Sequence, residues 1–127
     1  MRSAQALAQV GDLAKSAKVI NGISFISSVM TDGVSGDDLR KIAIDLRSRE
    51  DKSVVALISA NDGKPVLVVA TSEGARASGV KAGALVKIGS TVLGGGGGGK
   101  DDFAQGGGTD TSKSLEALTA ISNAIIG

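Results

Sequence analysis

The segment between residues 94 and 108 combines residue types that could bind a polar ligand. Nine of its fifteen residues are glycine, and its centre reads Lys-Asp-Asp-Phe-Ala-Gln, from Lys100 to Gln105. Glycine admits positive φ angles and lets another backbone come close, so N–H groups here can face an anion beside the Lys100 ammonium. We therefore expect an ordered binding loop. The alternative is a flexible linker, because ordering glycine costs the most conformational entropy.

Part of this segment matches the beginning of a nucleotide-binding P-loop. Gly94, four further residues, Gly99 and Lys100 have the required spacing. The next residue is Asp101, where a P-loop needs Ser or Thr to hold magnesium and where phosphates would meet a negative charge. A predicted helix precedes the segment instead of a strand, and more glycines follow where a helix should begin. These departures argue against nucleotide hydrolysis.

The residue types that the chain lacks narrow the chemistry further. With no Cys and no His, the chain cannot form disulfides, zinc sites of Cys or His type, or an imidazole acid or base. Asp101 and Asp102 could hold magnesium, but Asp next to glycine more often accepts hydrogen bonds from backbone N–H groups. We therefore expect no cofactor. Because 14 Lys and Arg stand against 13 Asp and Glu, any positive surface must come from the placement of charges.

The length and composition are those of one soluble domain. The chain has 127 residues, of which 42% are hydrophobic, enough for a single hydrophobic core. No run approaches the ~18 consecutive apolar residues of a membrane span, and the N-terminus has no apolar stretch typical of a secretory signal. These features predict a cytoplasmic protein without a membrane partner.

Hydrophobic periodicity in the first part of the chain predicts two helices and a strand. Residues 3–17 have helical spacing and are expected to end a longer upstream helix. Residues 19–30 are rich in β-branched side chains and predict a strand. Ser35 stands three residues before Asp38, which is a capping-box spacing at the start of a second helix. The buried face of this helix is expected to contain Leu39, Ile42, Ala43 and Leu46.

The second part of the chain predicts a hairpin and two more helices. Apolar runs at residues 54–60 and 66–70 flank turn residues 61–64 and predict antiparallel strands covered on both faces. A helix is predicted over residues 83–93, and a last helix at the N-cap residue Asp110. The inward residues of these helices are expected to be Leu85, Ile88, Val92, Leu115, Leu118, Ile121 and Ile125. This order predicts an α/β (α+β layered) fold with a mixed sheet packed by amphipathic helices and a Gly-rich loop before the last helix.

Taken together, these motifs resemble the C-terminal domain of alanyl-tRNA synthetases, a domain that is also appended to DHH-type phosphoesterases. The resemblance rests on the glycine-rich segment with its Asp-x-x-Gln core, on the hairpin, and on the Val-Lys-Ala-Gly-x-Leu-Val stretch from Val80. It implies that residues 1–17 end an upstream helical or coiled-coil segment and that residues 18–127 form a globular tRNA-binding domain. Phosphoesterases usually have a histidine after the glycine run, and Lys100 in its place argues against that branch.

The resemblance implies an accessory domain of an ATP-dependent alanine–tRNA ligase, without catalytic residues of its own. In that family the domain binds the outer corner of tRNA and helps dimerisation, so that aminoacylation and editing cooperate. The implied partners are alanine-specific tRNA, the rest of the synthetase chain and a second copy bound through the upstream helical segment. The residues expected to face RNA are Gly97, Gly98, Gly99, Lys100, Gln105, Gly106, Gly107, Arg76, Lys81 and Lys87.

Base stacking can contribute little to such an interface. The chain has no Trp and no Tyr, and its two aromatic residues are Phe25 in a predicted strand and Phe103 in the glycine-rich segment. We expect Phe103 to be the apolar anchor of the loop. Recognition would then depend on the shape and backbone of folded RNA, with weak binding by the isolated chain. A substrate-binding domain of a phosphoesterase and a stand-alone structural or interaction domain remain alternatives.

Overall fold

A computed structural model describes residues 18–126 with the exception of residues 21, 31–33, 50 and 62. Within these residues, one sheet has the strand order β1-β2-β3-β4-β6-β5. The strands are β1 (Lys18–Ile20), β2 (Ile23–Val29), β3 (Ser53–Asn61), β4 (Lys64–Thr71), β5 (Gly97–Gly99) and β6 (Phe103–Gly107). The β2 and β3 strands are parallel, and every other neighbouring pair is antiparallel. The prediction of a mixed sheet is confirmed.

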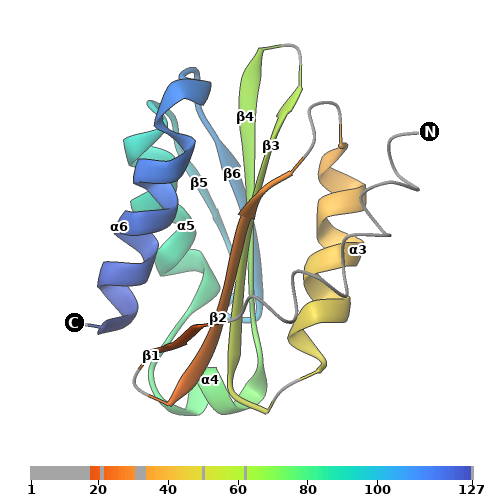
Figure 1. Ribbon diagram of the computed structural model, residues 1–127, viewed down its shortest axis with the longest axis vertical. Helices are drawn as coiled ribbons and strands as arrows, with labels where there is room; N and C mark the ends of the chain where they lie inside the picture. Colours follow the sequence, from red (N-terminus) through yellow and green to blue (C-terminus); the bar gives the residue numbers. More distant parts are fainter. Residues whose placement is uncertain (1–17, 21, 31–33, 50, 62, 127) are drawn as a thin grey trace.

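Helices cover both faces of this sheet (Figure 1). The α3 helix packs against β3 and β4 on one face, and α5 and α6 lie side by side on the other. The helices are α3 (Gly36–Arg47), α4 (Glu73–Ala77), α5 (Ala82–Val92) and α6 (Ser114–Ile126), with a 3-10 turn η1 (Thr111–Lys113) before α6. None of the described helices is long and apolar enough to cross a membrane. The predicted layered α/β architecture is therefore confirmed.

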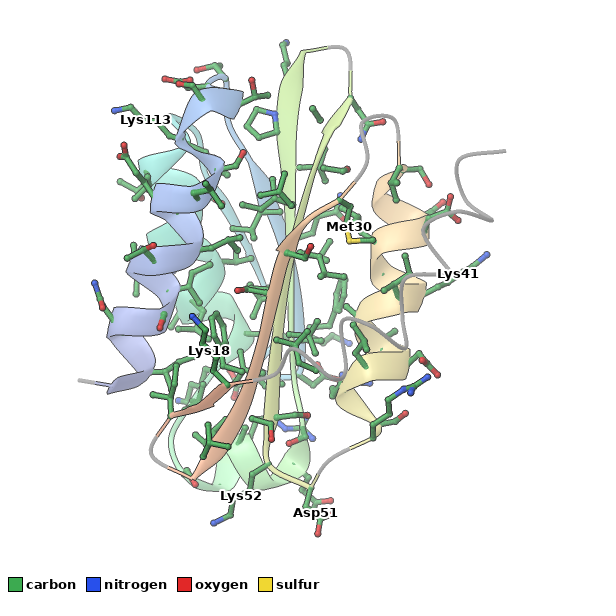
Figure 2. The ribbon with its side chains drawn as sticks, in the orientation of Figure 1. Lys18, Met30, Lys41, Asp51, Lys52 and Lys113 are labelled. Atoms are coloured by element: carbon green, nitrogen blue, oxygen red, sulfur yellow. The ribbon has the colours of Figure 1, made fainter. Side chains whose placement is uncertain are left out.

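The α3 helix begins and buries its side chains as predicted. The Ser35 hydroxyl accepts a hydrogen bond of 3.1 Å from the Asp38 N–H, which satisfies one of the free N–H groups of the first turn. Met30 lies between β2 and this helix, whereas Lys41 extends outward from it (Figure 2). The buried residues of α3 are Leu39, Ile42, Ala43 and Leu46. The amphipathic pattern therefore identified the correct face.

The hairpin of β3 and β4 forms the centre of the molecule. Its apolar side chains alternate between the two faces, so Leu57 joins the core under α3, and Ile58 joins the core under α5 and α6. Both strands have neighbours on each side and helices above and below. This position explains why nearly continuous apolar runs occur at residues 54–60 and 66–70.

Several element boundaries differ from the sequence prediction. The single strand predicted over residues 19–30 is two strands, because the chain reverses at Gly22, whose φ is 79°. The α4 helix was not predicted, since five residues are too few to show a period. The last helix begins at Ser114, because η1 occupies the first residues after Asp110. The helix predicted over residues 3–17 lies outside the described residues.

Two residues predicted to point inward are instead exposed. Ile88 is 37% exposed and Leu115 is 71% exposed. In both helices the buried side includes small residues, since Gly89 in α5 and Ala117 in α6 are buried. A Cβ atom on Gly89 would lie 2.6 Å from Leu67 Cδ2, so this glycine permits close packing of α5 on the sheet.

Candidate nucleic-acid interface

The glycine-rich segment is an antiparallel hairpin at one edge of the sheet. The β6 strand pairs with β4, and β5 pairs with β6 in a register that places Gly98 opposite Gln105. The Lys100 N–H donates a 3.0 Å hydrogen bond to the Phe103 carbonyl and closes the turn. The expected ordered loop is therefore a pair of strands, which corrects the prediction of a loop over residues 94–108 and is inconsistent with a flexible linker.

Close packing, more than unusual φ angles, explains why this hairpin needs glycine. Within the segment, Gly94 has a positive φ of 84°. A Cβ atom on Gly95 would overlap the Gly107 carbonyl, one on Gly106 would overlap the Ser90 hydroxyl, and one on Gly108 would overlap the Leu93 carbonyl. Larger residues would therefore push the hairpin away from its neighbours.

The turn of the hairpin is tied to the start of α5. The Ala82 N–H donates to the Asp101 carbonyl at 2.9 Å, and the Gly83 N–H donates to the Lys100 carbonyl at 3.1 Å. The Thr71 N–H donates to the Asp102 carbonyl at 3.0 Å. Main-chain carbonyls of both aspartates thus hold the turn, in place of the side-chain capping that we expected. In the described part of the chain, no cluster of three or more metal-ligating side chains is found.

Alternation along the strands gives the hairpin two different faces. One face lies against α5, since a Cβ atom on Gly97 would lie 3.0 Å from Val86 Cγ1. The other face is on the α3 side of the sheet, and Gly98 has open space above it, with no atom within 4 Å of its Cβ position. The predicted RNA-facing residues Gly97, Gly99 and Gly106 belong to the α5 face, and Gly98, Lys100, Gln105 and Gly107 belong to the α3-side face.

The three other predicted cations lie on helices near the hairpin or immediately before one. Lys81 is exposed and immediately precedes the residues of α5 that bind the turn. The Arg76 guanidinium is 4.0 Å from the Asp102 carboxylate, so it also lies beside the turn. Lys87 is exposed further along α5. The structure therefore gathers Lys81, Lys100 and Arg76 around the turn, while Lys87 lies along the other face.

Two arginines of α3 contact the hairpin and were missed in the sequence. The Arg40 guanidinium carbon lies 5.4 Å from the centre of the Phe103 ring, a cation–π distance. The Arg47 Nη1 donates a 3.0 Å hydrogen bond to the Asp102 carbonyl. Phe103 itself is half-buried and packs against the core under α3, which confirms its predicted role as an anchor. The seven-residue spacing of the two arginines was visible, but their position over the hairpin was not.

The exit from the hairpin is stabilised by Asp110. Its carboxylate accepts hydrogen bonds from the hydroxyl and the N–H of Ser112, the latter at 3.0 Å. The hydrogen bond from the Ser112 hydroxyl contributes most to holding the pKa of Asp110 below its usual 3.8, followed by the bond from the Ser112 N–H. The nearby charge of Lys113 acts in the same direction. The predicted N-cap is therefore present, although it caps η1 instead of α6.

Comparison with known proteins relates the chain to aminoacyl-tRNA synthetases. The sequence model of the DHHA1 domain family matches residues 22–127. The alanine–tRNA ligase of Paenarthrobacter aurescens (strain TC1) is 46% identical over 127 residues, which cover 98% of this chain and 14% of that enzyme. The chain thus corresponds to a small part of this relative.

Two solved structures share the fold. The C-Ala domain from Aquifex aeolicus alanyl-tRNA synthetase superposes with a TM-score of 0.82 at 30% identity, covering 88% of this chain and 99% of that domain. RecJ from Thermus thermophilus gives a TM-score of 0.66 at 14% identity, covering 98% of this chain and 18% of RecJ. At that identity, the similarity to RecJ concerns the fold alone.

Proposed function

Because this chain belongs to the DHHA1 domain family, we propose that it is the accessory C-terminal domain of an alanine–tRNA ligase and binds the outer corner of tRNA. The observation that carries the proposal is its homology to a C-Ala domain over nearly the whole of that domain. The 46% identity to a bacterial alanine–tRNA ligase supports the same assignment. The phosphoesterase alternative has less support, since Lys100 stands where those relatives usually have a histidine.

The proposed RNA-binding site is the glycine hairpin and the cations around its turn. Lys100, Lys81 and Arg76 supply positive charge for phosphates, and Gln105 supplies an amide on the same face as Lys100. Gly98 leaves the main chain accessible on this face, whereas a Cβ atom on Gly107 would lie 2.7 Å from the Pro65 carbonyl. Gly97, Gly99 and Gly106 face α5, so in this proposal they hold the hairpin against the helix, while Lys87 extends the positive charge along α5.

The activity of the whole enzyme would reside outside this chain. ATP-dependent aminoacylation and editing would be performed by the rest of the synthetase, since the chain has no His and no Cys. The proposed partners are alanine-specific tRNA, the remainder of the synthetase and, through the preceding helical segment, a second copy of the protein. The proposed location is the cytoplasm, where such ligases act.

The proposal is tested by titrating the 127-residue chain with alanine-specific tRNA at 50 and 150 mM salt. Contacts with three phosphates predict a slope of log K against log salt of about −2 to −3, and Lys100→Ala should make the slope shallower by about 1. Lys113→Ala is the matched control. Lys113 lies at the opposite end of the molecule from α4, the helix whose Arg76 lies beside the turn (Figures 1 and 2). An absence of binding at 50 mM salt would contradict an RNA-binding role for the chain.

A further inference from the structure

A line of residues on α3 lies against β6 and its turn. A Cβ atom on Gly36 would be 2.8 Å from the Gln105 amide nitrogen, so the start of the helix lies against a side chain from the middle of β6. One turn later Arg40 lies over Phe103, and two turns further Arg47 reaches Asp102. These helix positions, i, i+4 and i+11, share one side of the helix. The contacts therefore follow β6 in reverse order, from residue 105 to residue 102.

The two arginines are held in place and still have free hydrogen-bond donors. Arg47 uses Nη1 for the Asp102 carbonyl, and a guanidinium has five N–H donors. Arg40 is exposed and is oriented by the Phe103 ring. In the described ranges, the ion pairs join Arg49 to Asp45 and Arg76 to Asp102, so no described carboxylate lies within 4.0 Å of Arg40 or Arg47. Such oriented arginines lose little entropy when they bind a phosphate.

The surface beside these arginines has few side chains. Gly98 lies opposite Gln105, and neither Gly98 nor Gly96 has any atom within 4 Å of its Cβ position. Strand alternation places Lys100 on the same face. A phosphate backbone can therefore approach the main chain of β5 closely while arginine side chains reach it from α3. An acidic protein surface could bind the same cations, but it would not require an accessible main chain beside them.

We infer that Arg40 and Arg47 bind phosphates of the RNA, so that the binding surface extends from the glycine hairpin onto α3. This inference rests on the proposed tRNA-binding function and assigns that function to one face of the hairpin. The α3-side face has Arg40, Arg47, Lys100 and Gln105 around accessible glycines. On the α5 side the hairpin glycines pack against the helix, and Lys87 is exposed further along α5.

The test compares Arg40→Gln and Arg47→Gln with Lys41→Gln in the same tRNA titration. Lys41 is the next residue after Arg40 and points away from the sheet (Figure 2), so it controls for the loss of one positive charge from α3. Each arginine variant should weaken binding about two- to tenfold and make the salt slope shallower by about 0.9, whereas Lys41→Gln should behave like wild type. Arg40→Lys should keep the salt slope and lose part of the affinity, because lysine retains the charge without the planar fork.

Thermal unfolding of each variant separates loss of binding from loss of folding. Arg40→Gln should melt near the wild-type temperature, because the side chain is exposed. If wild-type protein binds tRNA and both arginine variants bind as Lys41→Gln does, the assignment to α3 is wrong while the proposed function stands. If wild-type protein does not bind at all, the proposed function itself fails.

Discussion

The two hairpins of the sheet have opposite compositions. The β3–β4 hairpin is built from large apolar side chains, and residues such as Leu57 and Leu67 are completely buried. The β5–β6 hairpin contains five glycines among its eight strand residues. The first is held by side chains that fill two cores, and the second by neighbours that approach its main chain. The difference shows that a strand pair can be specified either by what its side chains fill or by the space that missing side chains leave.

The two hairpins also differ in what they can offer a ligand. The faces of β3 and β4 are covered by helices, so most of their side chains are buried and contribute stability instead of a binding surface. The outer hairpin has one face against α5 and one open face with an accessible main chain at Gly98. The glycines therefore serve close packing on one side and exposure of the backbone on the other.

The largest expected effect is at the centre of the buried hairpin. Leu57→Ala should lower the free energy of unfolding by about 2–5 kcal/mol, because it removes buried methyl groups and leaves a cavity. Urea unfolding of the 127-residue chain measures this loss. Val29→Ala is the control, because Val29 is 44% exposed and should cost far less. Equal losses at both positions would contradict the view that side-chain burial holds β3 and β4.

A smaller loss is expected when a methyl group is added to the outer hairpin. Gly106→Ala should cost about 1–3 kcal/mol, because the new Cβ overlaps the Ser90 hydroxyl. That hydroxyl is buried and has no hydrogen-bond partner among the described residues. Ser90→Ala should therefore be neutral or stabilising on its own, and it should partly rescue Gly106→Ala. Strict additivity of the two changes in urea unfolding would show that the close approach does not determine the choice of glycine.

The open face of the same hairpin should respond in the opposite direction. Gly98→Ala meets no neighbouring atom, so it should stabilise the fold by about 0.4–1 kcal/mol through the unfolded state. The added methyl group should at the same time weaken tRNA binding, because it keeps the phosphate backbone away from β5. Thermal unfolding and the tRNA titration measure the two effects separately. A stabilised variant with unchanged tRNA affinity would show that RNA does not contact this face.

The smallest expected effect is at the exit from the outer hairpin and depends on pH. The pKa of Asp110 is lowered in the folded protein, so the unfolded chain binds more protons near its ordinary value of 3.8. The stabilisation by this carboxylate is therefore complete above about pH 3.8 and is lost as the pH falls through the lower folded value. Asp110→Asn keeps an oxygen acceptor but removes the charge. It should unfold slightly more easily than wild type at pH 7, with a difference that disappears toward pH 2; a constant difference would contradict this assignment.

The interior of the fold could be predicted from the sequence wherever a side-chain period exists. The capping serine Ser35, the buried face of α3 and the two strands of the central hairpin were all identified from spacing. These features depend on the residues themselves and on their near neighbours. The glycine-rich segment was recognised as ordered and as a family motif, but its two strands were not foreseen, since glycine has no side-chain alternation that could indicate a strand.

The candidate site depended much more on tertiary structure. Lys100 and Gln105 were found in the sequence because they stand in the motif, whereas Arg40 and Arg47 precede Lys100 by more than fifty residues. Their contacts exist because α3 packs on β3 and β4, and β6 pairs with β4. The sequence by itself determined the core elements and the family, because local periods and motifs carry that information. Only the tertiary structure decided which cations surround the hairpin, because long-range strand pairing brings them together.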